Sequence, residues 1–139
     1  MLRHVSPDVV INQDLLTLPE TASVKDAAIA MKDRGVHSVL VVEGDSLLGI
    51  FTGADLIDRV VANGRDPEAT KVGHVMTSSV ETVPPDALAI DALRKMSDGG
   101  FRHLPVVKDG RLVAVLSRQD FLREEEDEMD LEQALWEHL

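Results

Sequence analysis

The stretch that decides the fold is Gly49-Ile50-Phe51-Thr52-Gly53-Ala54-Asp55. It holds an apolar run, a hydroxyl residue, two variable positions and an aspartate that opens a new apolar-periodic segment. The apolar run predicts a buried strand, and the hydroxyl stands where a helix N-terminus offers unpaired backbone N–H groups. The helix macrodipole favours an aspartate in the first turn. Taken alone, this stretch predicts a strand followed by a capped helix.

The same order of residues returns sixty-five positions later, as Ala114-Val115-Leu116-Ser117-Arg118-Gln119-Asp120. Residues 17–57 and 82–122 align at this offset with twelve identities in 41 positions and without a gap. Such self-similarity indicates an internal duplication. Each copy is too short to bury its strands and helices alone, so we expect the two copies to share one core.

Each copy predicts the element order β-α-β-β-α, an α/β (α+β) class of fold. In the first copy Val24, Ala27, Ala28 and Met31 recur at helical spacing, and Gly35 is a stop signal. The second copy repeats the helical stripe around Met96, and its Asp109-Gly110 pair favours a type I′ hairpin turn. The predicted strands are 15–18, 38–42, 47–51, 104–107 and 112–116, and a helix is predicted over 55–62.

The chain divides in sequence order into four parts. Residues 1–64 form the first repeat with an N-terminal arm, 65–79 a polar connector, 80–123 the second repeat and 124–139 an acidic helical tail. Two interpretations of the tail stay open. Its apolar residues either cover the protein's own body or, through Trp136, anchor a contact with another molecule.

Composition limits the classes of function. The chain has 139 residues, 44% of them hydrophobic and 28% charged, as in a soluble globular protein. With no cysteine, disulfides and thiolate chemistry are excluded, and a cytoplasmic location is the default expectation. Of the net charge of −11, the tail carries −8, which disfavours a nucleic-acid partner. No apolar run approaches the roughly 20 residues of a membrane span, so we expect no membrane contact.

Two ordered sets of motifs resemble the cystathionine-β-synthase (CBS) domain. They are Gly35-Val36-His37-Ser38-Val39-Leu40-Val41-Val42 leading to Gly49–Asp55, and Phe101-Arg102-His103-Leu104-Pro105-Val106-Val107 leading to Leu116–Asp120. Two in tandem resemble the CBS-domain pair, or Bateman module, over about residues 9–123. The resemblance implies a regulatory sensor without catalytic residues, with adenosine-containing ligands in two clefts between the repeats.

The resemblance also implies which residues bind that ligand. The acids Asp55 and Asp120 would hold the ribose hydroxyls, and the hydroxyls of Thr52 and Ser117 would lie near ribose or phosphate. Because a carboxylate can accept hydrogen bonds from both hydroxyls of a cis-diol, the assignment is chemically sound. The base and cleft walls would come from Asn12, Leu15, Thr77, Val80, Val36, His37, Ser38, Phe101, Arg102 and His103. Of these, Arg102 and His103 are the best phosphate candidates.

The sequence departs from the family pattern at several positions. Many nucleotide-binding members carry a basic residue immediately before the acid, but Ala54 and Gln119 stand there. Leu40 replaces the usual proline of the first repeat, and Ser38 stands where the second repeat has His103. Ribose recognition is compatible with these departures, whereas tight polyphosphate binding is disfavoured. An adenine nucleotide (AMP, ADP, ATP or a similar adenosine-containing ligand) is the expected regulatory ligand, with no required cofactor.

Other chemistries have weaker signals. The five histidines show no short metal-ligand spacing, and no phosphate-binding glycine loop is present. Ser117 near Asp120 lacks the convergent histidine that a nucleophilic serine needs. Two function classes remain open: a sensor of adenosine-containing ligands, and a ligand-free dimerising scaffold. In both we expect a homodimer through the apolar helix faces, Leu56, Ile57, Val60 and Val61 in one repeat and Phe121 and Leu122 in the other.

Overall fold

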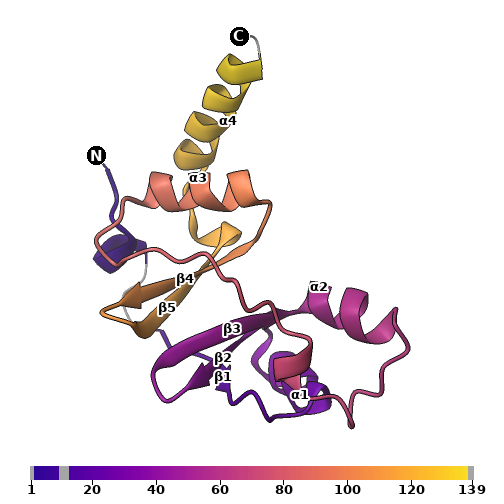
Figure 1. Cartoon of the computed structure of the whole chain (residues 1–139). Coiled ribbons are helices and arrows are strands. Elements are labelled where there is room, and N and C mark those ends of the chain that lie inside the picture. The colour runs from indigo at the N-terminus through magenta and orange to yellow at the C-terminus, as the bar shows by residue number, and fades with distance from the viewer. Residues whose placement is uncertain (1, 10–12, 138–139) are drawn as a thin grey trace. The chain divides into compact units, whose positions relative to one another are not determined.

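The computed structural model describes residues 2–9 and 13–137, which form two compact units (Figure 1). The first unit comprises Asp14–Val80 with Gly110–Leu112. The second comprises Met1–Gln13, Glu81–Asp109 and Val113–Leu139. Both mix helices with a small sheet, so the predicted α+β class is confirmed. No helix in the described part of the chain has the length and apolar character to cross a membrane.

The first unit is a three-stranded sheet with the order β1-β2-β3. Strand β1 runs parallel to β2, and β2 runs antiparallel to β3, as in the predicted hairpin. Its elements are β1 (Thr17–Leu18), α1 (Val24–Arg34), β2 (Ser38–Glu43), β3 (Ser46–Thr52), α2 (Gly53–Asp55), the helical segment η2 (Leu56–Val61) and the turn η3 (Val72–His74).

Local sequence signals explain the ends of α1. The Ser23 side chain accepts a hydrogen bond from Asp26 N, as a capping residue does. Gly35 ends the helix in the left-handed region, with φ at 65°, where a side chain would be strained. The apolar stripe of the helix faces the sheet, where Val24, Ala27 and Met31 pack with Phe51 in the core.

The second unit has a two-stranded sheet covered by helices. Its elements are η1 (Val5–Val9, interrupted at Ser6), α3 (Ala89–Gly99), β4 (His103–Lys108), β5 (Arg111–Ser117), the short turn η4 (Arg118–Asp120) and α4 (Arg123–Glu137). Asp109 and Gly110 both have positive φ, 51° and 79°, so the predicted type I′ turn is confirmed. The first strand of this repeat is reduced to a single parallel bridge between Val83 and Val106.

The N-terminal arm packs on the second repeat, although the sequence order groups it with the first. Val5 N donates to Ala87 O at 2.8 Å, and Ala89 N donates to Arg3 O at 2.8 Å. Val5 is fully buried in the core formed by α3, β4 and β5. The arm therefore supplies main-chain hydrogen bonds and apolar surface that the second repeat lacks.

The connector supplies main-chain hydrogen bonds and apolar surface to the first repeat, as the arm does to the second. Val72 N donates to Ala22 O at 2.7 Å, and Val24 N donates to Thr70 O at 2.9 Å, at the positions equivalent to those of the arm. Val72 is fully buried beside α1 and β3. Each repeat is thus completed by the segment that precedes the other repeat, and we call residues 2–9 and 70–77 the exchanged segments.

The acidic tail forms α4, which contacts α3 and rises steeply from it in Figure 1. Arg94 of α3 binds Glu132 through two hydrogen bonds of 3.0 and 2.8 Å, and Gln133 donates to Ser97 at 2.7 Å. Met129 is buried, which agrees with a helix that covers the protein's own body. The same helix also exposes Leu131, Leu135 and Trp136.

Candidate functional site

The two predicted acid-bearing turns have the same local geometry. We call Thr52 with Asp55 and the residues around them the Asp55 half-site, and Ser117 with Asp120 and their surroundings the Asp120 half-site. Each lies at the end of the second hairpin strand of its repeat. The Asp55 half-site belongs to the first compact unit and the Asp120 half-site to the second.

In the Asp55 half-site, Thr52 and Asp55 form a reciprocal capping box. Thr52 N donates to Asp55 Oδ2 at 3.0 Å, the Thr52 hydroxyl lies 3.2 Å from the same oxygen, and Asp55 N donates to Thr52 Oγ1 at 3.3 Å. The helix cap predicted from sequence is therefore present. It fixes the carboxylate at the start of a helix, where backbone N–H groups and the macrodipole favour negative charge.

Residues at the start of β2 lie beside this turn. Ser38 pairs with Thr52 across the sheet, and Gly53 N donates to His37 O at 3.0 Å. Ser38 is buried, whereas His37 is exposed and Val36 is 37% exposed. The hairpin thus brings the predicted residues of 36–38 next to the acid-bearing turn.

The exchanged segment forms another edge of the Asp55 half-site. Thr77 exchanges two backbone hydrogen bonds of 2.9 Å with Ile50 of β3, two residues before Thr52. Thr77 belongs to the predicted connector, and the structure places it in the first unit. The reason is the exchange: the segment that leads into the second repeat pairs with the hairpin of the first. Val80, half-buried, ends this unit.

In the Asp120 half-site, the carboxylate is again held by its own turn. Ser117 N donates to Asp120 Oδ2 at 2.7 Å, and the Ser117 hydroxyl lies 3.4 Å from this oxygen. These contacts use Oδ2 alone, so Oδ1 can accept from an incoming hydroxyl group. In the Asp55 half-site, by contrast, Arg59 Nε lies 3.6 Å from Asp55 Oδ1.

The turn before β4 approaches the Asp120 half-site through the main chain. Arg118 N donates to Arg102 O at 3.2 Å, which joins the two predicted segments. Arg102 is exposed, His103 begins β4, and Phe101 is half-buried against α3 and the hairpin core. A guanidinium and an imidazole thus stand on the segment that flanks the Ser117 turn.

The remaining predicted residues have different surroundings. Leu15 is half-buried in the first unit and directly precedes Leu16, whose carbonyl accepts from Leu40 N at 3.0 Å. Asn12 lies outside the described residues. Its neighbour Gln13 exchanges side-chain hydrogen bonds of 2.9 and 2.7 Å with the backbone of Val115. Val115 is the sequence equivalent of Ile50, so this contact is the counterpart of the Thr77 pair.

Sequence reasoning missed two arginines at these half-sites. Arg59 donates to Val75 O at 3.2 Å and to Met76 O at 2.9 Å, which ties the exchanged segment to the Asp55 turn. Its spacing of four residues from Asp55 on a helix is a signal that could have revealed it. Arg3 reaches the Asp120 turn from the N-terminal arm, and no local spacing could have indicated that contact.

The half-sites are suited to bind a neutral diol close to an anion. They offer a fixed carboxylate oxygen, a turn with helical N–H groups and, in the second unit, cationic side chains nearby. Among residues 2–9 and 13–137 no group of three or more metal-ligating side chains converges. The arrangement is one acid-bearing turn built twice, once in each repeat.

A comparison with known proteins identifies the family to which this chain belongs. The family model of the CBS domain matches residues 5–62 and 72–127. The chain therefore belongs to the CBS-domain family and is a tandem CBS module, as the sequence motifs indicated.

Similar proteins extend this result. An Arabidopsis thaliana CBS domain-containing protein, CBSCBSPB2, is 47% identical over 102 residues, which cover 73% of this chain and 19% of that protein. The solved structure of a Burkholderia ambifaria protein with CBS domains, described as a signal-transduction protein, matches at 31% identity with a TM-score of 0.75, over 81% of this chain and 85% of that one. The Pyrobaculum aerophilum CBS domain protein PAE2072, solved in complex with AMP, matches at 26% identity with a TM-score of 0.77, over 87% and 95% of the two chains. This chain spans about a fifth of the length of the Arabidopsis relative.

Proposed function

We propose that the chain is a non-catalytic sensor module that binds an adenosine-containing ligand, with AMP as the first candidate. The observation that carries this proposal is the duplicated turn in which the acid's Oδ2 is held by its own backbone. Because Oδ2 is fixed in this way, the carboxylate can accept hydrogen bonds from a ribose cis-diol through Oδ1 without having to be ordered on binding. The AMP complex of the similar Pyrobaculum protein supports the choice of nucleotide.

The residues near each turn suggest how the rest of the ligand is held. Arg102 and His103 flank the Asp120 turn and would face a phosphate group, and Thr77 flanks the Asp55 turn from the exchanged segment. The Asp120 turn contains Arg118, but Ala54 and Gln119 stand directly before the acids, where many nucleotide-binding members of the family carry a basic residue. We therefore favour a monophosphate over a triphosphate.

The test is isothermal titration calorimetry of the full chain with AMP, ADP, ATP, S-adenosylmethionine and NADH. AMP is then compared with 2′-deoxy-AMP, which lacks one hydroxyl of the diol. Because the deoxy analogue leaves a carboxylate hydrogen bond unmade, its affinity should fall about tenfold or more. No heat with any adenosine-containing ligand would reject the proposal. Equal affinity for AMP and 2′-deoxy-AMP would reject the role of the carboxylates.

A second candidate function is a dimerising scaffold without a ligand. Ile57 and Val61, on the helical segment after Asp55, are 62% and 65% exposed. Of the face expected from sequence, however, Val60 is fully buried and Phe121 is 8% exposed, so both belong to the core. The exposed apolar surface is therefore smaller than the sequence predicted.

We propose a homodimer that buries Ile57 and Val61 together with Leu122. Light scattering of the full chain at micromolar concentration measures its mass, and the double substitution Ile57→Lys, Val61→Lys should halve the mass of a dimer. The matched control is Leu131→Lys, Leu135→Lys, which places the same charges on α4, where the acidic tail would repel its own copy. A monomeric full chain, or a dimer lost only in the α4 variant, would overturn this assembly.

A further inference from the structure

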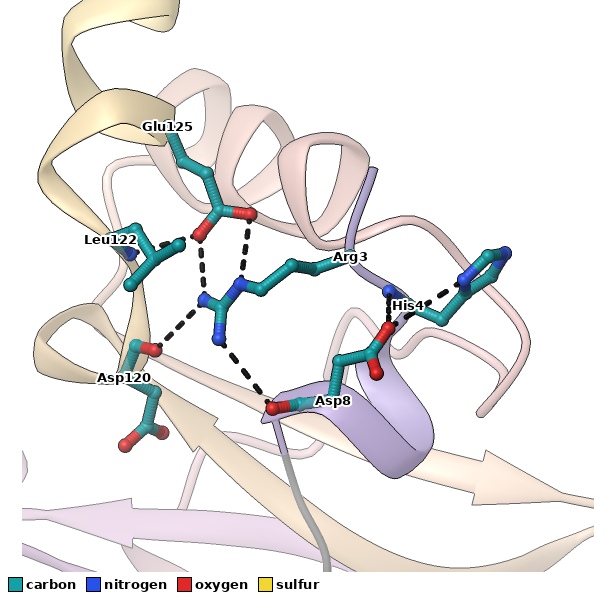
Figure 2. Close-up of polar contacts among 6 residues, drawn as sticks. All are labelled: Arg3, His4, Asp8, Asp120, Leu122 and Glu125. Carbon is teal, nitrogen blue, oxygen red and sulfur yellow. Dashed lines mark hydrogen bonds and ion pairs between the residues drawn. The ribbon is translucent and has the colours of Figure 1, made fainter. Parts of the chain in front are cut away.

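Arg3 joins the N-terminal arm to the Asp120 turn and to the start of α4, which lie 117 and 122 positions away in the sequence (Figure 2). Its guanidinium donates to Glu125 through Nε at 3.4 Å and Nη2 at 2.7 Å, to Asp120 O at 3.3 Å and to Asp8 O at 3.5 Å. The side chain is 22% exposed, so the contacts are only partly screened by water. One residue of the N-terminal arm thus holds both the acid-bearing turn and the start of α4.

The two acid-bearing turns differ in the backbone on their C-terminal side. After Asp55 the chain continues as helix through η2. After Asp120 the chain leaves the turn at Phe121, which is extended with φ −94° and ψ 149°, and helix begins again at Arg123. No continuing helix therefore supplies a backbone N–H for the Asp120 carbonyl. The Arg3 guanidinium donates to this carbonyl instead.

Glu125 extends this contact to α4. Its Oε1 accepts from Leu122 N at 2.9 Å as well as from Arg3, and the residue is only 9% exposed. A carboxylate buried to this extent needs a partner charge, because burial without one is costly. Arg3 is that partner, so the start of α4 and the Asp120 turn depend on the same guanidinium.

The arm is held in place independently of the Arg3 side chain. Its backbone bonds to Ala87 and Ala89 involve main-chain atoms only. His4 N also donates to Asp8 Oδ2 at 2.6 Å, which stabilises the turn within the arm (Figure 2). Removing the guanidinium should therefore leave the arm docked and alter the turn selectively.

We infer that Arg3 is a positioning residue for the Asp120 half-site: it fixes the turn that presents the Asp120 carboxylate and couples that turn to α4. The inference rests on the proposed function for its effect on ligand affinity, but its effect on the turn can be measured without ligand. Ligand bound at Asp120 would in this way be linked to the docking of the arm and of α4.

The test compares Arg3→Met with Arg94→Met in the full chain. Arg94 is a matched control because it also fixes α4 through a two-bond contact to a glutamate, yet it contacts neither Asp120 nor Leu122. Methionine keeps most of the apolar stem in both variants. Amide hydrogen exchange of the ligand-free protein reports on the turn through Ser117 N–H, and calorimetry with AMP reports on binding.

In Arg3→Met we expect faster exchange at Ser117 and Leu122, and an AMP affinity about three- to thirtyfold weaker, the range for coupling through one positioning contact. Arg94→Met should leave both quantities unchanged. Unchanged exchange at Ser117 in Arg3→Met, or the same change in both variants, would overturn the inference. If wild type binds no AMP, the proposed function fails while the exchange experiment still decides the role of Arg3.

Discussion

The most direct test of the exchanged segment is the substitution Gly49→Ala. A Cβ at Gly49 would lie 2.6 Å from Thr77 O and 2.6 Å from Met76 Sδ. The Met76 thioether can rotate away, but the carbonyl can move only with its backbone. The exchanged segment would therefore have to leave the edge of β3.

The loss of unfolding free energy in Gly49→Ala can be estimated from the contacts that this displacement breaks. Thr77 and Ile50 exchange two hydrogen bonds of 2.9 Å, each of which contributes about 0.5–1.5 kcal/mol net. Forcing an extra methyl group into a packed site costs about 1–3 kcal/mol in general. The lost hydrogen bonds and the overpacking are two descriptions of the same displacement, so the two energies are not added. We expect Gly49→Ala to lower the free energy of unfolding by about 2–3 kcal/mol.

Urea denaturation monitored by circular dichroism measures this change. The matched control is Gly53→Ala, four residues later, where a Cβ would meet nothing within 4 Å. Gly53 lies in α2, so alanine should be neutral or slightly stabilising there. Equal stability of the two variants would refute the reasoning that the segment is clamped against Gly49. The second repeat carries Ala114 at the equivalent position, next to Val115, whose backbone is bonded by the side chain of Gln13.

Three further predictions rest on the same geometry. Asp120→Ala should weaken AMP binding about tenfold by calorimetry and Asp55→Ala less, because Arg59 already occupies Asp55 Oδ1; equal losses would reject this ranking. The hydrogen bonds from Arg94 lower the pKa of Glu132 below its ordinary value of 4.5, so the contact of α4 with α3 is fully present above pH 4.5 and is lost as pH falls through the lowered pKa. Urea midpoints at pH 6 and pH 3.5 should therefore differ more in wild type than in Glu132→Gln, and an identical pH dependence would contradict the assignment. Finally, a protease site inserted at the exposed residue Gly64 should yield fragments that co-elute on gel filtration, because each carries a segment that completes the other; two separately eluting halves would contradict the exchange.

Local patterns in the sequence are sufficient to predict most of the elements. The capped start and the glycine stop of α1, the Asp109-Gly110 turn and the two capping boxes depend on residues within one or two turns of each other. Such signals act over the same short distances in any chain, so they can be read before the fold is known. The duplication then assigned the same elements to both repeats.

Two predictions that rested on local patterns are wrong. The helix expected to begin at Asp120 is a single turn, and α4 starts at Arg123 after an extended Phe121. Val60 and Phe121, interpreted as an assembly face, are buried in the cores of their own units. In both cases packing against distant segments, which no local window contains, outweighed the periodicity.

Only the tertiary structure shows which hairpin each exchanged segment completes. Because the two repeats share one pattern, the pattern alone does not indicate which of them residues 70–77 complete. Thr77 accordingly pairs with Ile50, and Arg3 holds Asp120 from 117 positions away. The residues of the half-sites could be named from the sequence because their chemistry is local. Their grouping could not, because it is set by hydrogen bonds between segments that become neighbours only on folding.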